Sequence, residues 1–526
     1  MKRRKKYVFF LLFVVSTLLI ATGFVVGNGN GVTLRQQNID TITGNAPVNY
    51  NGDEALPLDT TTTYVSEIDE TVQDESVQMK TNGYETLRRT LNSASHNRIS
   101  LKNVLRGILG IIVIMGMAWL FSNNRKAIRW KYVLSALLFQ IVLAVCIIYV
   151  PAFSTFFNFI GKMFLVVTAS AEDGIVFLFG NLINFEPIGY MFAFKILPSI
   201  IFFSTISSML FYWGIIQIVV KGLGWFFSKI MGLSGVESLS LAGNIFMGQT
   251  EAPLIVKQYL PNVTDAEMFM VMVGGMATMS GGVLSAYIAL LGGGDPQASI
   301  FFARHLLAAS VMAAPASVVI GRILVPQPFK EVQDVVVEKV DKSKTNILDV
   351  ITNGAIEGTK LAGNVAAMLL VFVALISFCN IILFKIGDVT SLNEIIAANT
   401  NYDALSLQCV LGYALSPLMW IIGVPSSDIF YLGQLLGEKT IINEFVGYAT
   451  LNDMITNGLL QPKSIIMGVY LMCGFANFGS IGIQIGGIGS LAPTKRHVLS
   501  QFGVRALIVA ASTALLSSVI MGAILG

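Results

Sequence analysis

Apolar stretches of about twenty residues alternate with short polar loops from residue 101 to the end of the chain. A helix of about 20 apolar residues is long enough to cross the hydrocarbon core of a bilayer. Two further stretches, 156–182 and 216–231, carry charged residues or glycines and are predicted to lie at the membrane interface. The predicted spans number about eight: 104–121, 132–149, 190–215, 269–291, 302–325, 361–384, 464–488 and 506–525.

Two apolar stretches are interrupted in a way that a straight span does not tolerate. Residues 239–260 contain Gly243 and Asn244 and then the run 248–253, while residues 414–448 are interrupted at 423–428 and at 443–444. Irregular backbone at membrane depth occurs where it is buried in protein or lines a cavity. Both stretches therefore predict re-entrant hairpins that enter and leave on one side.

Each predicted hairpin precedes a span with a weak point of its own, at 276–282 after the first and at 473–480 after the second. Broken segments at matching positions of two halves indicate the binding site of a secondary transporter. The predicted fold is an all-α polytopic membrane protein with about eight transmembrane helices, two re-entrant hairpins in inverted repeats, and interfacial helices.

Basic loops orient the predicted spans. Loops rich in Lys and Arg stay in the cytoplasm, which places 125–131 and 495–497 there. By the order of the spans, the charged loop 330–344 is then also cytoplasmic. This arrangement holds when both hairpins return to the side from which they came. It also leaves the segment before the first span and the end of the chain outside.

The N-terminal region differs from the rest of the chain. Residues 1–27 have five basic residues directly after Met1 and continue into an apolar run followed by Ala21, which predicts a signal peptide or an uncleaved anchor. Residues 28–100 are polar, with more acids than bases, and predict an exported and largely disordered segment. These features place the protein in a bacterial-type inner (plasma) membrane.

The membrane part divides by the same pattern into successive regions. Residues 101–235 form an N-terminal region of scaffold and interfacial helices, and 236–325 contain the first hairpin and the helices after it. A charged cytoplasmic loop at 326–350 separates these from 351–526, which contain the second hairpin and the C-terminal spans.

Composition excludes a soluble chain of this length. Hydrophobic residues make up 54% and charged residues 12%, against about 25% charged in soluble domains. A net charge of +3 gives no sign of nucleic-acid binding. The four cysteines lie within apolar stretches and the three histidines are scattered, so we expect no disulfide, no zinc site and no cofactor.

Glu251 is the strongest candidate for a functional residue in the first hairpin. A carboxylate at membrane depth is costly unless it is paired, hydrated or protonated. Gln249 and Thr250 add an amide and a hydroxyl beside it, a set that suits the edge of a heterocycle or a sugar. The alternative is a structural cluster that closes the hairpin tip.

Glu444 has the same position in the second hairpin, and its alternative role is a salt bridge to Lys439. Asn477 and Ser480 would share one face if their segment is helical, either to bind a ligand or to pack helices together. We expect Glu251 and Glu444 to face one shared cavity.

Oxygen-bearing groups near the first hairpin suggest a cation site. Asn244 and Thr278 offer side-chain oxygens, and the backbone carbonyls of Met247 and Met279 could add two more. Sodium is a hard ion that takes oxygen ligands, although a hydroxyl in a span is more often satisfied by its own helix.

At these motifs the chain resembles the concentrative nucleoside transporter family. The resemblance extends from about residue 104 to the C-terminus and is strongest in three segments, 248–254, 437–448 and 473–482. It implies a homotrimer in which each subunit has a scaffold and a mobile transport domain, and symport of a nucleoside with a cation.

Carried over by residue, the resemblance implies two sets of contacts. Gln249, Thr250 and Glu251 would face the base. Glu444, Asn477 and Ser480 would hold the ribose, and Phe475 would lie against the nucleoside. The implied sodium ligands are Asn244, Met247, Thr278 and Met279.

The prediction of the coupling ion depends on two details of the sequence. Relatives commonly have Ser where this chain has Thr278, and both side chains offer a hydroxyl. Proton-coupled relatives tend to lack the Thr-Glu-Ala-Pro run that this chain has at 250–253, which favours sodium over a proton.

Two other classes of function fit the apolar composition less well. A channel would not need carboxylates on two separate hairpins. An intramembrane hydrolase would need a nucleophile and base pair that the sequence does not show, so we predict no enzyme activity. The sequence leaves open whether purine or pyrimidine nucleosides are preferred.

Overall fold

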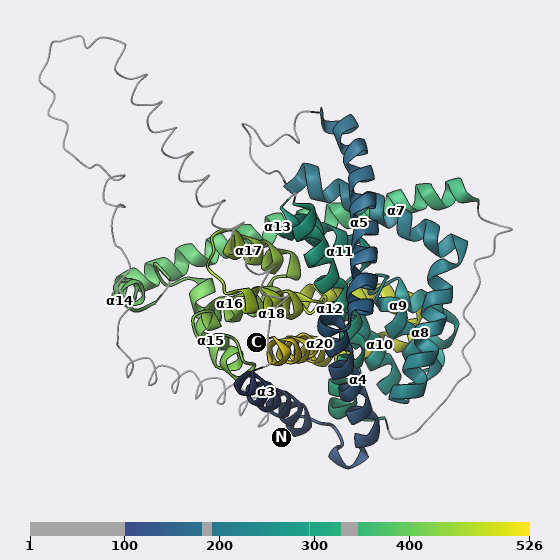
Figure 1. Ribbon diagram of the computed structural model, residues 1–526, viewed down its shortest axis with the longest axis horizontal. Coiled ribbons are helices and arrows are strands. Elements are labelled where there is room, and N and C mark those ends of the chain that lie inside the picture. Colours follow the sequence, from purple (N-terminus) through teal and green to yellow (C-terminus); the bar gives the residue numbers. More distant parts are fainter. Residues whose placement is uncertain (1–99, 181–191, 294, 328–345, 401, 526) are drawn as a thin grey trace, which may run out of the picture. The chain divides into compact units, whose positions relative to one another are not determined.

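The computed structural model describes residues 100–180, 192–293, 295–327, 346–400 and 402–525, and every regular element in these ranges is a helix. The predicted signal or anchor at 1–27, nearly all of the exported segment at 28–100, and the charged loop at 330–344 lie outside the described residues (Figure 1).

The helices follow one another with short connections. Those of the first half are α3 (Leu101–Leu120), η1 (Arg125–Ala127), α4 (Trp130–Tyr149), α5 (Pro151–Phe179), α7 (Phe192–Trp213), α8 (Ile215–Met231), α9 (Gly235–Asn244), η3 (Ala252–Asn262), α10 (Asp265–Ala277), α11 (Gly281–Gly292) and α12 (Pro296–Leu324). Those of the second half are α13 (Ile347–Val389), α14 (Leu392–Asn399), α15 (Leu407–Ile421), α16 (Ile429–Ile441), α17 (Glu444–Thr456), α18 (Pro462–Met472), α19 (Phe478–Leu491), η4 (Pro493–Lys495) and α20 (Arg496–Ile524).

The same order of elements occurs twice. A helix of 17 or 15 residues (α8, α15) precedes two short helices joined by a tip (α9 and η3, α16 and α17). A helix broken in its middle follows (α10 and α11, α18 and α19), and each half ends in a helix of 29 residues, α12 or α20. This is the repeat predicted from the two interrupted stretches.

Eight helices among the described residues are long and apolar enough to cross a membrane, and seven of them cover predicted spans. The eighth is α5, where we predicted an interfacial helix. The predicted span at 464–488 is instead divided into α18 and α19, of 11 and 14 residues. Its weak point is a complete break, since Cys473 to Asn477 are not helical.

The second hairpin lies further along the chain than predicted. The interruption at 423–428 is the connection between α15 and α16, so α15 is a separate helix before the hairpin. The hairpin is α16 and α17, which pack against each other and turn at Ile442 and Asn443. The interruption at 443–444 is therefore the tip.

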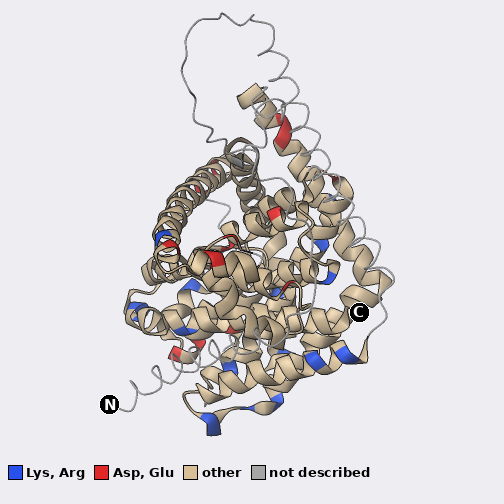
Figure 2. Ribbon diagram, turned by 90° about the vertical axis from the view of Figure 1, so that its left-hand side faces the viewer, with Lys and Arg blue, Asp and Glu red and all other residues tan. Residues whose placement is uncertain are grey.

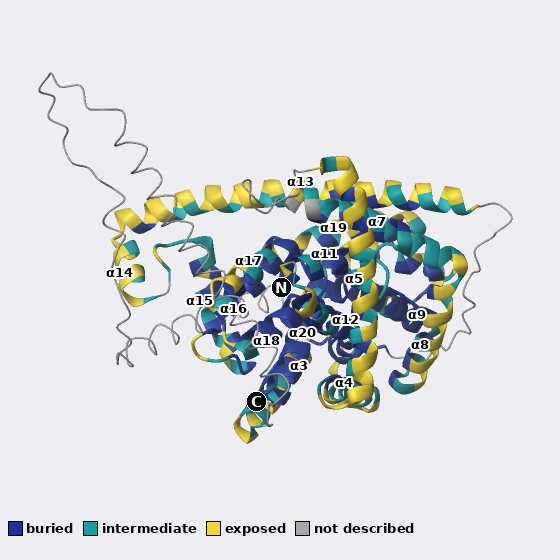
Figure 3. Cartoon of the chain, turned by 45° about the horizontal axis from the view of Figure 1, so that its top comes forward, coloured by how far each residue is buried: buried dark blue, intermediate teal, exposed yellow. Residues whose placement is uncertain are grey.

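Helix α13 is the longest element, with 43 residues where we predicted a span of 24 at 361–384. At a rise of about 1.5 Å per residue it is about 65 Å long, twice the thickness of a hydrocarbon core. Its first half packs on α7 through glycines, since a methyl group at Gly358 would lie 2.7 Å from the Cα atom of Ile201. Figure 3 shows the rest of α13 largely exposed.

Hydrogen bonds at the helix ends agree with the predicted topology. Asn103 at the start of α3 and Tyr149 at the end of α4 donate to the carbonyls of Leu525 and Ile524, so three ends predicted to be outside lie together. On the opposite side, the Asn123 N–H donates to the Leu324 carbonyl and Arg505 donates to the Asn123 side chain.

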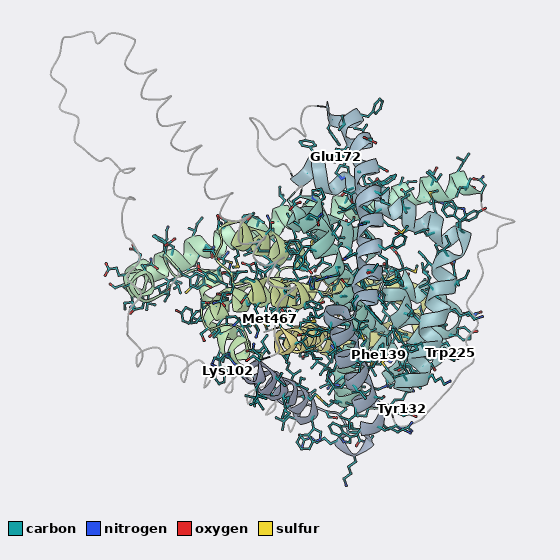
Figure 4. All side chains as sticks on the ribbon, in the orientation of Figure 1. Lys102, Tyr132, Phe139, Glu172, Trp225 and Met467 are labelled. Carbon is teal, nitrogen blue, oxygen red and sulfur yellow. The ribbon has the colours of Figure 1, made fainter. Side chains whose placement is uncertain are left out.

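The core surrounds the two 29-residue helices, α12 and α20, which pack on each other and on α10 and α18. In Figure 4 the labelled Met467 of α18 lies inside, and it is fully buried. The outer helices α4 and α8 meet through aromatic rings. The ring centroids of Phe139 and Phe226 are 5.3 Å apart. Figure 2 shows Lys and Arg mainly toward the lower part of that view.

Candidate functional site

The first hairpin begins with a well-capped helix and ends in an irregular tip. Ser234 caps α9 and exchanges hydrogen bonds with Glu237, whose carboxylate also pairs with Arg322 of α12 at 2.6 Å. The helix ends at Asn244, and the chain turns through 245–251 before η3. This ion pair, which sequence reasoning missed, anchors the base of the hairpin to the core.

Glu251 closes the tip of this hairpin. Its Oε2 atom accepts a hydrogen bond from the Gly248 N–H at 3.2 Å, as the structural alternative expected. Glu357 of α13 is close enough to interact electrostatically with the Glu251 carboxylate. Thr250 packs on α19, because a methyl group on Gly487 would overlap its side chain.

The second hairpin places Glu444 at the first position of α17. Asn443 caps this helix, with its side-chain oxygen accepting from the Val446 N–H at 2.9 Å. Glu444 is buried, and its carboxylate accepts from Asn477 at 2.8 Å and from the Tyr287 hydroxyl at 3.3 Å. A carboxylate at a helix N-terminus is favoured by the helix dipole.

Lys439 does not form a salt bridge with Glu444, which was the alternative role considered for Glu444. Ion pairs within 4 Å in the described part of the chain do not include these two residues. The Lys439 ammonium instead donates to the carbonyls of Leu471 and Cys473 at the end of α18.

The break between α18 and α19 corrects the prediction for Asn477 and Ser480. They do not share a helix face, because Asn477 precedes α19 as its N-cap and accepts a hydrogen bond from the Ser480 N–H at 2.9 Å. Gly474, with φ of +89°, makes the turn into this break. Capping aims the Asn477 amide away from α19 and toward Glu444.

A continuous chain of hydrogen bonds joins the two hairpins. Gln249 donates to the Ser480 hydroxyl at 3.4 Å, across 231 residues of sequence. The backbone N–H of Ser480 donates to the Asn477 oxygen, the Asn477 amide donates to Glu444, and Glu444 also accepts from the Tyr287 hydroxyl of α11. Four of the predicted residues therefore form one buried polar network: Gln249, Glu444, Asn477 and Ser480.

The network does not contain every predicted residue. Glu251 and Glu444 have no direct link, and Gln249 is the side chain that connects their hairpins. Phe475 packs on the apolar core. A cavity of about 580 Å³ lies elsewhere, between α13 and the second hairpin, and its lining includes Glu438 and Thr450.

Two polar residues in or beside the network were not predicted from the sequence. Tyr287 lies in an apolar helix, where a single tyrosine gives no signal. Gln484 is fully buried and donates to the Met272 carbonyl at 3.0 Å, close to Gln249 across Gly275. A polar residue inside an apolar stretch is a usable signal, so Gln484 could have been found.

The segments that carry the four predicted cation ligands lie next to each other. The Phe246 carbonyl accepts from the Gly281 N–H at 3.1 Å, which brings the tip with Met247 to the α10–α11 break with Met279. Asn244 and Thr278 both lie against Gly274, whose carbonyl accepts from the Thr278 hydroxyl.

Unused oxygen atoms at this point fit a hard cation. The side-chain oxygen of Asn244 is buried and accepts no hydrogen bond from any described residue. Within the described ranges, the backbone carbonyls of Met247 and Met279 also accept no hydrogen bond. A buried acceptor without a partner is costly, so the Asn244 oxygen favours an oxygen-binding ion such as sodium, and the two free carbonyls could add ligands to it.

Comparisons with known proteins give matches to family profiles, to relatives and to a solved structure. Three family profiles match the chain: "Na+ dependent nucleoside transporter N-terminus" over residues 109–182, "Nucleoside recognition" over 193–294 and "Na+ dependent nucleoside transporter C-terminus" over 305–522. Together they cover most of the part that the structure describes.

Similar proteins come from bacteria and mammals. An "uncharacterized transporter" of Haemophilus influenzae is 40% identical over 81% of this chain and 98% of its own length. "Nucleoside permease NupC" of Helicobacter pylori is 34% identical over 80% and 98%. "Sodium/nucleoside cotransporter 1" of Rattus norvegicus is 35% identical over 78% of this chain and 62% of its own length.

A solved structure has the same fold. "CNTnw in an inward-facing substrate-bound state" superposes with a TM-score of 0.73 at 36% identity, and the match covers 80% of this chain and 98% of that one.

Proposed function

Because the chain belongs to the concentrative nucleoside transporter family, a family of membrane transporters and not of enzymes, we propose that it imports nucleosides by symport with sodium. The observation that carries this proposal is the buried polar network that joins the tips of the two hairpins through the break between α18 and α19. Its donors and acceptors match the hydroxyls and ring edges of a nucleoside.

The proposed substrate contacts follow the network. Glu444 and Asn477 would exchange their mutual hydrogen bond for bonds to ribose hydroxyls, and Ser480 would do the same on the other side. Gln249 has a buried carbonyl oxygen without a partner among the described residues, which supports a contact with the base. Thr250 and Glu251 on the same tip would complete the base contacts, and Phe475 would lie against the nucleoside.

Sodium would enter between the first tip and the α10–α11 break. Asn244, Thr278 and the carbonyls of Met247 and Met279 would supply its ligands. Binding there orders residues 245–251, which hold Gln249, Thr250 and Glu251 in place for the nucleoside. Sodium and nucleoside then strengthen each other's binding by the same factor.

We further propose a homotrimer in the bacterial inner membrane, with residues 28–100 exported. The long α13 supports an assembly, because its exposed face is apolar over more than the thickness of a bilayer. Such a face can be covered by lipid along part of its length and by other subunits along the rest.

Uptake of labelled uridine and adenosine by the purified full-length chain in proteoliposomes tests the proposal. An inward sodium gradient should drive accumulation above equilibrium, and choline in place of sodium at fixed pH should abolish it. Accumulation driven by a pH gradient without sodium would assign a proton as the coupling ion. Equilibration without accumulation under either gradient would indicate a channel.

A further inference from the structure

A buried lysine occupies the break of the second repeat. Lys439 lies in the last turn of α16 and its side chain is completely buried. Its ammonium donates to the carbonyl of Leu471 at 3.0 Å and to that of Cys473 at 2.5 Å. The last carbonyls of a helix have no partner within the helix and carry the negative end of its dipole, so α18 ends on a positive charge.

The equivalent place in the first repeat is the proposed sodium site. There, Asn244 ends the first hairpin helix, α9, and Thr278 and Met279 follow the end of the first half of the broken helix, α10. In the second repeat, α16 corresponds to α9 and α18 corresponds to α10. Both places lie between the end of a hairpin helix and a helix break.

The two places differ in what balances their oxygens. Neither α9 nor α10 contains a lysine or an arginine, and the Asn244 side-chain oxygen is without a partner among the described residues. In the second repeat a covalently attached ammonium already contacts the break carbonyls. One place is built for an exchangeable cation, and the other contains a cation that cannot leave.

We propose that Lys439 is a built-in cation that takes, in the second repeat, the place that the coupling sodium takes in the first. The inference rests on the proposed function and adds a positioning residue to it. Lys439 acts without touching the substrate, since it fixes the end of α18 and with it the break that presents Asn477.

The positive charge of Lys439 also stabilises the Glu444 carboxylate. Lys439 lies five residues before Glu444 and interacts with its carboxylate electrostatically, outside ion-pair distance. A buried carboxylate is stable only when hydrogen bonds or opposite charges compensate it. Lys439 therefore compensates the Glu444 carboxylate in the second repeat. The coupling sodium would in the same way stabilise the base-contacting residues on the first tip.

Two substitutions separate a cationic role from simple packing. Lys439→Met keeps most of the side-chain volume and removes the charge, while Lys439→Ala removes both and leaves space beside the two carbonyls. The full-length wild type and both variants would be reconstituted, and sodium and uridine fluxes measured together across a series of sodium concentrations.

We expect the wild type to show a sodium Hill coefficient of about one and Lys439→Ala a value approaching two, with the sodium-to-uridine ratio rising in parallel. Lys439→Met should lose uridine affinity by about 5- to 150-fold, the usual range of coupling between sites, at every sodium concentration. A purely structural role would make alanine at least as harmful as methionine and would leave the Hill coefficient unchanged.

Sodium-dependent thermal stabilisation of the purified variants gives a second readout that needs no transport. Lys439→Ala should gain more stabilisation from sodium than the wild type, and Lys439→Met should not. A wild-type ratio of two sodium ions, or equal sodium dependence of both variants in flux and melting, would overturn the inference. Sodium-independent uptake by the wild type would instead overturn the proposed function.

Discussion

Replacing Glu444 by Gln tests the polar network at its most charged point. The substitution keeps the side-chain shape and removes the negative charge. In the structure the carboxylate accepts from Asn477 at 2.8 Å and from Tyr287 at 3.3 Å. A Gln carbonyl can still accept from Asn477, and the Tyr287 hydroxyl can turn to accept from the new amide, so we expect the variant to fold.

The expected loss follows from the change in hydrogen-bond type. Bonds to a charged group contribute about 1.5–3 kcal/mol and bonds between neutral groups about 0.5–1.5 kcal/mol. A difference of about 1 kcal/mol at each of two ribose hydroxyls gives about 2 kcal/mol, or about 30-fold weaker uridine binding. Calorimetry on the purified protein measures this directly.

Two controls make the test specific. Glu438→Gln changes another buried acid of the same hairpin, which accepts from Gln434 and lies outside the network, and should leave uridine affinity within about threefold. For 2′,3′-dideoxyuridine the difference between wild type and Glu444→Gln should nearly disappear. Equal losses for uridine and the dideoxy analogue would refute a role of Glu444 in holding the sugar.

Four further predictions address the ion, the fold and the topology. Thr278→Val should raise the sodium concentration for half-maximal uptake by about tenfold, whereas Thr278→Ser should stay within about threefold, because only the hydroxyl is needed. Gly358→Ala should destabilise the purified protein by about 1–3 kcal/mol, because the added methyl meets the Ile201 backbone. Gly363→Ala, with open space around it, should be neutral in the same melting assay. In a Cys379→Ala background, cysteine at Ser100 should react with an impermeant maleimide added outside, and cysteine at Asn124 only after the membrane is opened; the reverse pattern would invert the topology. Sodium should slow hydrogen exchange at 245–251 but not at 442–447, and equal protection of both tips would contradict the assignment of a single exchangeable site.

Much of the candidate site could be predicted because intramembrane polar residues are costly and therefore stand out. Glu444 and Asn477 interrupt apolar runs, and the structure places them 2.8 Å apart. Asn244 was predicted on weaker grounds, and its unpartnered oxygen now supports it. Tyr287 could not be found, since a tyrosine inside an apolar helix resembles packing.

The errors arose where one pattern has two structural meanings. Glycine and proline occur both at the ends of helices and at the tips of hairpins. At 423–428 they end a helix, although we predicted that they interrupt a hairpin. Asn477 and Ser480 were placed on one helix face, but Asn is also a strong N-cap and here starts α19. Helix α13 extends into a charged segment that a hydropathy pattern assigns to the neighbouring loop.

If Asn244 binds sodium and Lys439 replaces it, as proposed above, the difference between them would explain how two similar repeats can perform one transport cycle. A helix broken inside a membrane leaves carbonyls that cost about 1–3 kcal/mol each unless something satisfies them. In the proposed mechanism a free ion satisfies them only while it is bound, so the first tip would order and loosen with sodium. Lys439 is covalently attached and donates to two of them, so it would keep Glu444 and Asn477 in place throughout the cycle. The second repeat can therefore act as the fixed half of the site, and the first as the half that responds to the ion gradient.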